Sequence, residues 1–161
     1  MIVRATLNSE AETAAFAARL ASTLKKGDVV LLSGQIGAGK SHFARAALRS
    51  LMAKAGSVEE VPSPTFTLVQ TYQIGGQEIW HCDLYRLSDP FEVEELGLLD
   101  AFEEAITFLE WPEKLGEIAP PDALWISLSL SARNGARDME IRFGEERWSE
   151  RIKLVLSEGA N

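Results

Sequence analysis

The sequence has a single cysteine, Cys82, so no disulfide can form within the chain. No apolar run approaches the roughly 20 residues of a membrane-spanning helix, and the N-terminal segment turns polar too early for a signal peptide. Basic residues are in the minority, since 16 Lys and Arg against 24 Asp and Glu give a formal net charge of -8. That charge is poorly suited to wrapping DNA or RNA, because phosphate binding depends on clustered Lys and Arg. We therefore expect a cytoplasmic protein with no membrane segment.

The remaining composition is that of an ordinary globular protein. Hydrophobic residues make up 46% of the chain and charged residues 25%, as is typical of a soluble domain. The 161 residues fit the usual size of one domain, roughly 100–200 residues, and such a chain can bury a core without a disulfide or a metal. We expect a single domain over residues 1–161.

The N-terminal third predicts a strand, a glycine-rich loop and a helix, in that order. Asp28–Ser33 is a nearly continuous apolar run, the pattern of a central parallel strand covered on both faces. Gly34–Gly39 is rich in glycine, and Lys40–Lys54 has apolar residues at helical spacing. An earlier helix is indicated by Ser9-Glu10-Ala11-Glu12, which has the pattern of a capping box.

Further strands and helices follow in the rest of the chain. Thr67–Ile74 and Gln77–Leu87 are rich in β-forming residues and flank Gly75-Gly76, which predicts an antiparallel hairpin. Ile106–Leu109 is another short apolar strand, and Glu145–Leu156 fits either a terminal helix or a strand. The expected fold class is therefore α/β, with a mixed, mainly parallel central sheet, an inserted antiparallel hairpin and flanking helices.

The loop between the first predicted strand and helix carries a phosphate-binding motif. Residues 34–41, GQIGAGKS, match the P-loop pattern G-x-x-x-x-G-K-[ST] in full. Glycines let backbone N–H groups converge on phosphate oxygens, and the helix N-terminus adds partial positive charge. We expect Lys40 to reach the β- and γ-phosphates and Ser41 to bind Mg²⁺. The sequence therefore predicts a P-loop NTPase domain whose nucleotide contacts include Ile36, Gly37, Ala38, Gly39, Lys40 and Ser41.

A second acidic group is expected near the metal. Glu110 directly follows the predicted strand Ile106–Leu109, and carboxylates at strand ends beside a P-loop commonly hold Mg²⁺. Asp83 is the alternative candidate for this role. His81 and Asp83 share one face of a strand, with Cys82 on the other. A His/Cys/Asp metal cluster is thus the weaker alternative to a buried core thiol. Thr65 either senses Mg²⁺ or the γ-phosphate, as switch threonines do, or belongs to a rigid diproline connector.

Four segments together resemble one protein family. The segments GQIGAGKS (34–41), SPTFTLV (63–69), HCDLYRL (81–87) and LEWPEKL (109–115) occur in the order and at the intervals of the bacterial TsaE family, also called YjeE. The resemblance runs from the first helix to about Arg137. It implies a small P-loop ATPase that works with TsaB and TsaD in tRNA threonylcarbamoyladenosine synthesis. In that family TsaD transfers the threonylcarbamoyl group to the adenosine beside the anticodon, and ATP hydrolysis by TsaE supports repeated turnover.

The resemblance also implies roles for residues at the matching positions. Lys40 and Ser41 match the family's phosphate and Mg²⁺ residues, and Glu110 matches its Mg²⁺-binding acid. Asp83 matches an acid that is important for hydrolysis, and Thr65 matches the family's switch-like threonine. The implied cofactors are ATP and Mg²⁺.

Two further positions match the family, and two positions differ from it. Glu10, at the start of the first helix, and Arg137 fall where the family contacts the nucleotide away from the phosphates. The family usually has Asp where this chain has Gln35, and a pair of threonines where it has Ser41-His42. Serine keeps a hydroxyl for Mg²⁺, so metal binding should survive.

Other P-loop functions stay open on the residues alone. A small-molecule kinase usually carries an Arg-bearing lid; the chain has Arg133 and Arg137 but no evident basic lid segment. A GTPase normally reads guanine with N-K-x-D after the P-loop, whereas the nearest string in this chain, KKGD at 25–28, lacks the Asn and lies before the P-loop. A nucleotide-binding scaffold would bind ATP without turnover. We expect an ATPase that is weak alone and dependent on its partners.

The net charge of -8 also bears on the partners. It is a poor basis for a main tRNA surface, so we expect tRNA to be held chiefly through TsaB and TsaD. One acidic stretch is either a solvated helix face or a docking face for a basic partner surface. It comprises Glu92, Glu94, Glu95, Glu103 and Glu104.

Overall fold

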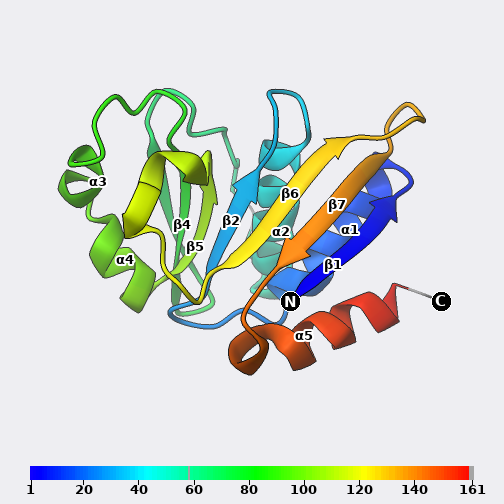
Figure 1. Cartoon of the computed structure of the whole chain (residues 1–161). Helices are drawn as coiled ribbons and strands as arrows, with labels where there is room; N and C mark the ends of the chain where they lie inside the picture. The colour runs from blue at the N-terminus through cyan, green and yellow to red at the C-terminus, as the bar shows by residue number, and fades with distance from the viewer. Residues whose placement is uncertain (58, 160–161) are drawn as a thin grey trace.

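The computed structural model describes residues 1–57 and 59–159, which form one seven-stranded sheet with helices on both faces (Figure 1). The strands are β1 (Ile2–Leu7), β2 (Val29–Ser33), β3 (Val69–Ile74), β4 (Gln77–Asp83), β5 (Ile106–Glu110), β6 (Leu124–Leu130) and β7 (Arg137–Arg142). The helices are α1 (Glu10–Ala21), α2 (Lys40–Lys54), α3 (Glu92–Glu95), α4 (Leu98–Glu104), the 3-10 helix η1 (Pro112–Ile118) and α5 (Glu145–Glu158). None of the helices in these ranges has both the length and the apolar character that a membrane crossing requires.

The strand order is β1-β7-β6-β2-β5-β4-β3. The central strand β2 pairs in parallel with β5 and β6, and β4 extends the parallel part beyond β5. Antiparallel pairs lie outside this core, with β3 against β4 at one edge and β7 between β6 and β1 at the other. The predicted α/β class, mixed sheet and inserted hairpin are thus confirmed. The hairpin turns at Gly75 and Gly76, whose φ values of 57° and 80° suit a two-residue hairpin turn.

The strand β2 separates two hydrophobic cores. Val30 and Leu32 face the core formed with α1, α2 and α5, whereas Val29 and Leu31 face the core under α3, α4 and η1. All four side chains are at most 3% exposed. The prediction of a strand covered on both faces is therefore confirmed. Burial on both faces fixes the position of the loop that leaves the end of β2.

Local signals account for the ends of several helices. Glu12 N–H donates to Ser9 Oγ at 3.1 Å, and the Glu12 carboxylate accepts from Asn8 N–H at 2.6 Å, so the capping pattern forms. The C-terminal segment, which fits a helix or a strand in sequence, is the helix α5. Its inner face is set by Trp148 and Ile152, which are both buried at helical spacing.

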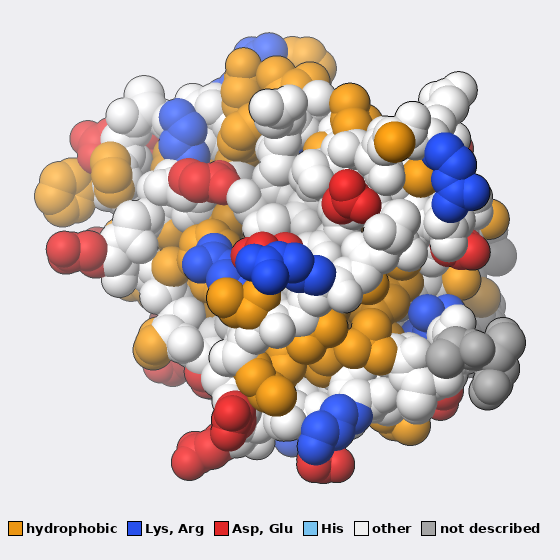
Figure 2. Space-filling view, turned by 45° about the vertical axis from the view of Figure 1, so that its right-hand side comes forward, with side chains coloured by type: hydrophobic (Ala, Val, Ile, Leu, Met, Phe, Trp, Pro, Cys, Tyr) orange, Lys and Arg blue, Asp and Glu red, His pale blue; other side chains and the backbone are white. Residues whose placement is uncertain are grey.

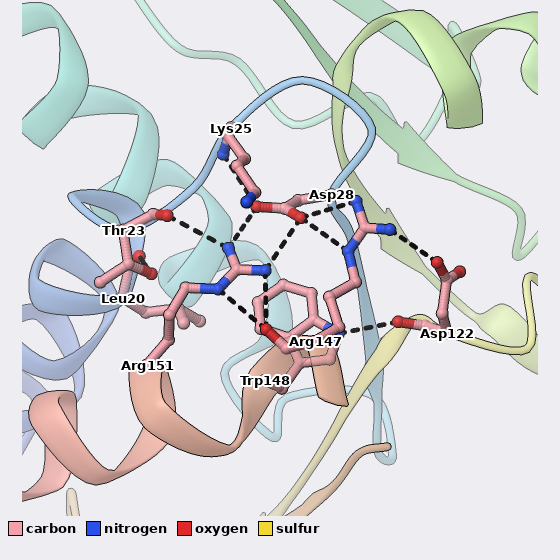
Figure 3. Close-up of polar contacts among 8 residues, drawn as sticks. All are labelled: Leu20, Thr23, Lys25, Asp28, Asp122, Arg147, Trp148 and Arg151. Atoms are coloured by element: carbon pink, nitrogen blue, oxygen red, sulfur yellow. Dashed lines mark hydrogen bonds and ion pairs between the residues drawn. The ribbon is translucent and has the colours of Figure 1, made fainter. Parts of the chain in front are cut away.

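A buried acid at the start of β2 holds α5 to the sheet (Figure 3). Asp28 is fully buried, and its Oδ1 accepts from Arg147 Nε at 3.0 Å and from Arg151 Nη2 at 3.1 Å. The N–H of Lys25 donates to Oδ2 at 2.8 Å. Burial alone raises the pKa of Asp28, but hydrogen bonds from Arg151, Lys25 and Arg147 outweigh it and hold that pKa below its usual value. The carboxylate is therefore ionised and paired, which makes its loss costly.

We predict that Asp28→Asn destabilises the protein by about 3 kcal/mol, because two arginines lose their shared carboxylate. Urea unfolding at neutral pH measures this. The stabilisation is complete above the ordinary pKa of aspartate and fades as pH falls below about 4, toward the lowered pKa of the folded state.

The matched control is Glu140→Gln, which removes the exposed pair with Arg4. It should change the free energy of unfolding by no more than about 1 kcal/mol. Equal losses in the two variants would show that the Asp28 cluster does not anchor α5.

Candidate functional site

The P-loop connects β2 to α2 at the carboxyl ends of the parallel strands, at the top of Figure 1. A Cβ at Gly34 would lie 2.4 Å from the carbonyl oxygen of Leu128, so only glycine fits where the loop crosses β6. Gly39 has a φ of 107°, which is also costly for other residues. The first-turn N–H groups of α2 have no partners within the helix and concentrate positive charge at this loop. The arrangement suits a phosphate group.

The loop forms one wall of a cleft of about 440 Å³. The cleft brings together nearly all of the predicted site residues: Glu10, Ile36, Gly37, Gly39, Lys40, Ser41, Thr65, Asp83, Glu110 and Arg137. Ala38 is the exception, because its side chain is buried behind the loop at 2% exposure. The lining residues that sequence reasoning did not assign to the site are His42, Arg45, Tyr85 and Trp111. The sequence signal that could have found them is their closeness in the chain to the predicted site residues Ser41, Asp83 and Glu110.

Lys40 lies folded against the wall of the cleft. Its Nζ donates to the carbonyl oxygens of Gly34 and Gln35, the latter at 3.0 Å, and lies 3.9 Å from the centroid of the Trp111 ring. Burial lowers the pKa of Lys40, while nearby carboxylates, Glu110 foremost, act in the opposite direction. The ammonium group is thus held by weak acceptors that a phosphate oxygen can replace.

Ser41 and Glu110 meet across the cleft. The Ser41 hydroxyl donates to Glu110 Oε1 at 2.8 Å, although the residues are 69 positions apart. Glu110 ends β5, and only 2% of it is exposed. The pair supplies a hydroxyl and a carboxylate oxygen at one point, and oxygen is the ligand that Mg²⁺ prefers.

Asp83 and Thr65 lie beside this pair. In the parallel register Asp83 is level with Glu110, and its Oδ2 accepts from the Thr65 hydroxyl at 3.3 Å. The other oxygen, Oδ1, accepts from the Tyr85 N–H at 2.9 Å. Burial raises the pKa of Asp83, and the negative charge of Glu110 adds to the effect. The structure therefore brings both candidate acids to one cleft.

Glu10 and Arg137 lie at the other end of the loop. Arg137 Nε donates to the Ala38 carbonyl oxygen at 2.7 Å, so the guanidinium braces the P-loop from the side of β7. His42 Nε2 lies 3.0 Å from the Glu10 carbonyl oxygen and joins α2 to the start of α1. Glu10 and Arg137 therefore line the cleft beside the P-loop rather than beside Asp83 and Glu110.

The alternative of a His/Cys/Asp metal cluster gains no support. Within residues 1–57 and 59–159, no group of three His, Cys, Asp or Glu side chains is placed to hold a metal ion. Cys82 faces the core on the opposite side of the sheet from Asp83, where burial strongly raises the pKa of its thiol. The prediction of a buried core thiol is confirmed.

A second hollow, of about 540 Å³, lies on the open face of β1, β7 and β6. Its charged groups are engaged in surface contacts, since Arg4 pairs with Glu140 at 3.1 Å and Asp138 accepts from Thr6 at 3.1 Å. The hollow lies away from the P-loop, so we place the functional site in the smaller cleft.

Comparison with known sequences gives the family. A sequence model described as "Threonylcarbamoyl adenosine biosynthesis protein TsaE" matches residues 7–139. The chain belongs to the TsaE family. TsaE proteins belong to tRNA threonylcarbamoyladenosine biosynthesis, in agreement with the resemblance of the four motifs.

Individual TsaE relatives extend over most of the chain. TsaE of Rickettsia bellii is 42% identical over 124 residues, which are 77% of this chain and 84% of the relative. TsaE of Bacillus subtilis is 37% identical over 139 residues, or 86% and 82% of the two chains. The crystal structure of YdiB from Bacillus subtilis aligns with a TM-score of 0.79 and 25% identity, covering 100% of this chain and 97% of that one. The fold is thus that of a P-loop NTPase-like TsaE protein.

We predict that Trp111 reports binding in the cleft, because a phosphate must draw Lys40 away from the indole ring. Adding ATP should change the tryptophan fluorescence of the protein. The change should be largely lost in Trp111→Phe, which keeps a ring for Lys40.

The matched control is Trp125→Phe, since Trp125 stacks with Arg142 outside the cleft. This variant should keep the fluorescence change. An undiminished response in Trp111→Phe would contradict the predicted movement of Lys40.

Proposed function

We propose that this protein is a Mg²⁺-dependent ATPase of tRNA threonylcarbamoyladenosine biosynthesis that acts with TsaB and TsaD and does not itself transfer the threonylcarbamoyl group. One observation carries the proposal: Lys40, Ser41, Asp83 and Glu110 converge in one cleft beside a complete P-loop. Hydrolysis of a nucleoside triphosphate needs these groups together, because phosphoryl transfer depends on positioning and charge stabilisation.

The triphosphate would be held by the P-loop N–H groups and by Lys40. The lysine ammonium has three donors, and two of them are engaged with loop carbonyl oxygens. Phosphate oxygens are stronger acceptors, because the hydrogen bonds are then charge-assisted on both sides. We assign Glu10 and Arg137, which line the cleft beyond the loop, to contacts with the rest of the nucleotide.

Ser41 and Glu110 would hold Mg²⁺. Their facing oxygens, 2.8 Å apart, form a hard donor set without a thiolate, which fits Mg²⁺ rather than zinc. When bound, Mg²⁺ neutralises phosphate charge as the terminal phosphoryl group leaves. Glu110 lies at the end of a strand buried along its length, so the carboxylate is positioned before the metal arrives.

Asp83 is the group that we assign to the attacking water. Its two oxygens are fixed by Thr65 and by the Tyr85 N–H, and only 4% of the residue is exposed. The raised pKa of Asp83, caused chiefly by burial, makes the carboxylate a better proton acceptor. The Thr65 hydroxyl donates to it from the loop between α2 and β3, so the position of this loop affects hydrolysis.

The partner contact would complete the site through the loop 62–66. Phe66 is 78% exposed directly beside Thr65, and Arg86 stacks on its ring at 4.4 Å. Ile36, on the P-loop, is 74% exposed at the cleft mouth. Large apolar side chains in the open mark protein contacts, and a docked partner can supply the charge or order that slow hydrolysis lacks.

The surface charge supports an indirect relation to tRNA. Figure 2 shows basic side chains in small groups interspersed with acidic ones on one face of the molecule. Together with the net charge of -8, this favours TsaB and TsaD as the main tRNA-binding surface. We accordingly place the protein in the cytoplasm with that complex.

The site assignment predicts different defects for two variants. Lys40→Ala should weaken ATP binding about 100-fold or more, because a buried charge-assisted contact is lost. Glu110→Ala should leave much of the nucleotide affinity and mainly reduce Mg²⁺-dependent turnover. Binding of a fluorescent ATP analogue and phosphate release measure the two effects.

The control is Lys54→Ala, at the exposed end of α2, which should match the wild type in both assays. Wild-type turnover in both cleft variants would refute the site. Tight ATP binding without turnover in any mixture would leave a nucleotide-binding scaffold.

The partner assignment predicts that purified TsaB and TsaD raise the rate of ATP hydrolysis. Phe66→Ala should lower the affinity for TsaB–TsaD about tenfold or more, as central aromatic contacts commonly do, without changing ATP affinity. Phe91→Ala is the matched control, since Phe91 is also 76% exposed but adjoins the acidic stretch.

The opposite pattern, with Phe91→Ala alone weakening the complex, would move the docking face to that acidic stretch. A rate unaffected by TsaB and TsaD would point to a kinase, to be tested with small phosphate acceptors.

A further inference from the structure

His81 is a fully buried polar residue that the proposed reaction does not use. It lies on β4 beneath α2, level with Phe108 of β5 and Gln70 of β3, and none of its surface is exposed. Its Nε2 lies 2.8 Å from Glu110 Oε2. Its Nδ1 has no hydrogen-bond partner within the described ranges. The contact with Glu110 is therefore the polar interaction that accounts for a histidine here.

Because of this contact, each oxygen of the Glu110 carboxylate has a different hydrogen-bond partner. Oε1 faces the Ser41 hydroxyl in the cleft, at 2.8 Å. Oε2 points inward to His81, at the same distance. With Nε2 as the donor, the ring leaves an acceptor rather than an N–H unpaired at Nδ1, which is the less costly arrangement. The carboxylate plane is then fixed by two hydrogen bonds on opposite sides.

A carboxylate without such a partner is poorly fixed. The terminal torsion of glutamate has a broad, roughly two-fold preference, so the group could turn away from Ser41. Oε2 would also be left buried and unpaired, which costs free energy. His81 itself cannot move easily, because β4 is paired on both sides by β3 and β5. It is thus a rigid support for a ligand at the end of a neighbouring strand.

We propose that His81 is a positioning residue that holds the Glu110 carboxylate with one oxygen turned to the Ser41 hydroxyl, and so builds the Mg²⁺ site before the metal and the nucleotide bind. The inference rests on the proposed ATPase function and adds to it the residue that tunes the affinity for Mg²⁺. Partners of metal ligands commonly act in this way, and their loss typically weakens metal binding about 10–100-fold.

The test compares the affinity for a fluorescent ATP analogue in MgCl₂ with that in EDTA. The ratio of the two affinities isolates the contribution of Mg²⁺ and needs no hydrolysis. For His81→Leu we expect the ratio to fall about tenfold or more, with the EDTA affinity unchanged. For His81→Gln we expect most of the wild-type ratio, because the glutamine amide reaches about as far as Nε2.

His81→Asn separates positioning from polarity and packing. Its amide is one bond shorter and cannot reach Glu110 as glutamine does, so it should behave like His81→Leu. This pair keeps the test decisive if the leucine variant fails to fold. Thermal unfolding of each variant measures the purely structural effect.

Two results would overturn the inference. One is an unchanged affinity ratio in His81→Leu or His81→Asn with only the thermal stability lowered, which would make His81 a packing residue. The other is an equal loss of the ratio in His81→Gln and His81→Asn. If the wild-type protein binds ATP equally well in MgCl₂ and in EDTA, the Mg²⁺ site of the proposed function itself fails, and His81 has no metal ligand to position.

Discussion

The parallel pairing of β2, β5 and β4 sets the positions of the P-loop, Glu110 and Asp83 relative to one another. The register places Glu110 opposite Leu32 of β2 and opposite Asp83 of β4, so the three strands end at one level. The loop that leaves β2 therefore turns directly over two carboxylates. If β5 slipped by one residue, Glu110 would face the other side of the sheet and lose Ser41. The chemistry of the site depends first on backbone hydrogen bonding, and only then on the side chains.

Buried charges lie near both ends of the central strand β2, and the two groups of charges have different partners. At its start, Asp28 is fully paired with two arginines, so its pKa is held low and its role is to anchor α5. Beside its carboxyl end, Glu110 of β5 and Asp83 of β4 lie close together, and the nearby cation, Lys40, bonds to backbone carbonyls. The first cluster is complete without a ligand. The second has negative charge and a loosely held cation, an arrangement that a cation–phosphate complex would satisfy.

Much of this could be predicted where the signal is local. The P-loop, the Gly75-Gly76 hairpin and the Ser9 cap each lie within a few consecutive residues. Contacts between distant segments could be predicted only where the family resemblance gave two residues a shared role, as for Ser41 and Glu110. Asp28 and Arg151 are 123 positions apart, and His81 and Glu110 are 29 apart, so spacing carries no information about them. The segment 145–158 fits both a helix and a strand locally, and its packing against the sheet decides for the helix.

The helix α5 lies beyond residue 139, where the match to the family ends. Yet its arginines neutralise the acid at the base of β2, and its Trp148 is wholly inside the core. The part of the chain that identifies the family is thus not the whole cooperative unit. Trimming the gene to the recognised family boundaries would leave a hydrophobic face and a buried carboxylate open to water. The evolutionary signature and the folding unit of this protein have different ends.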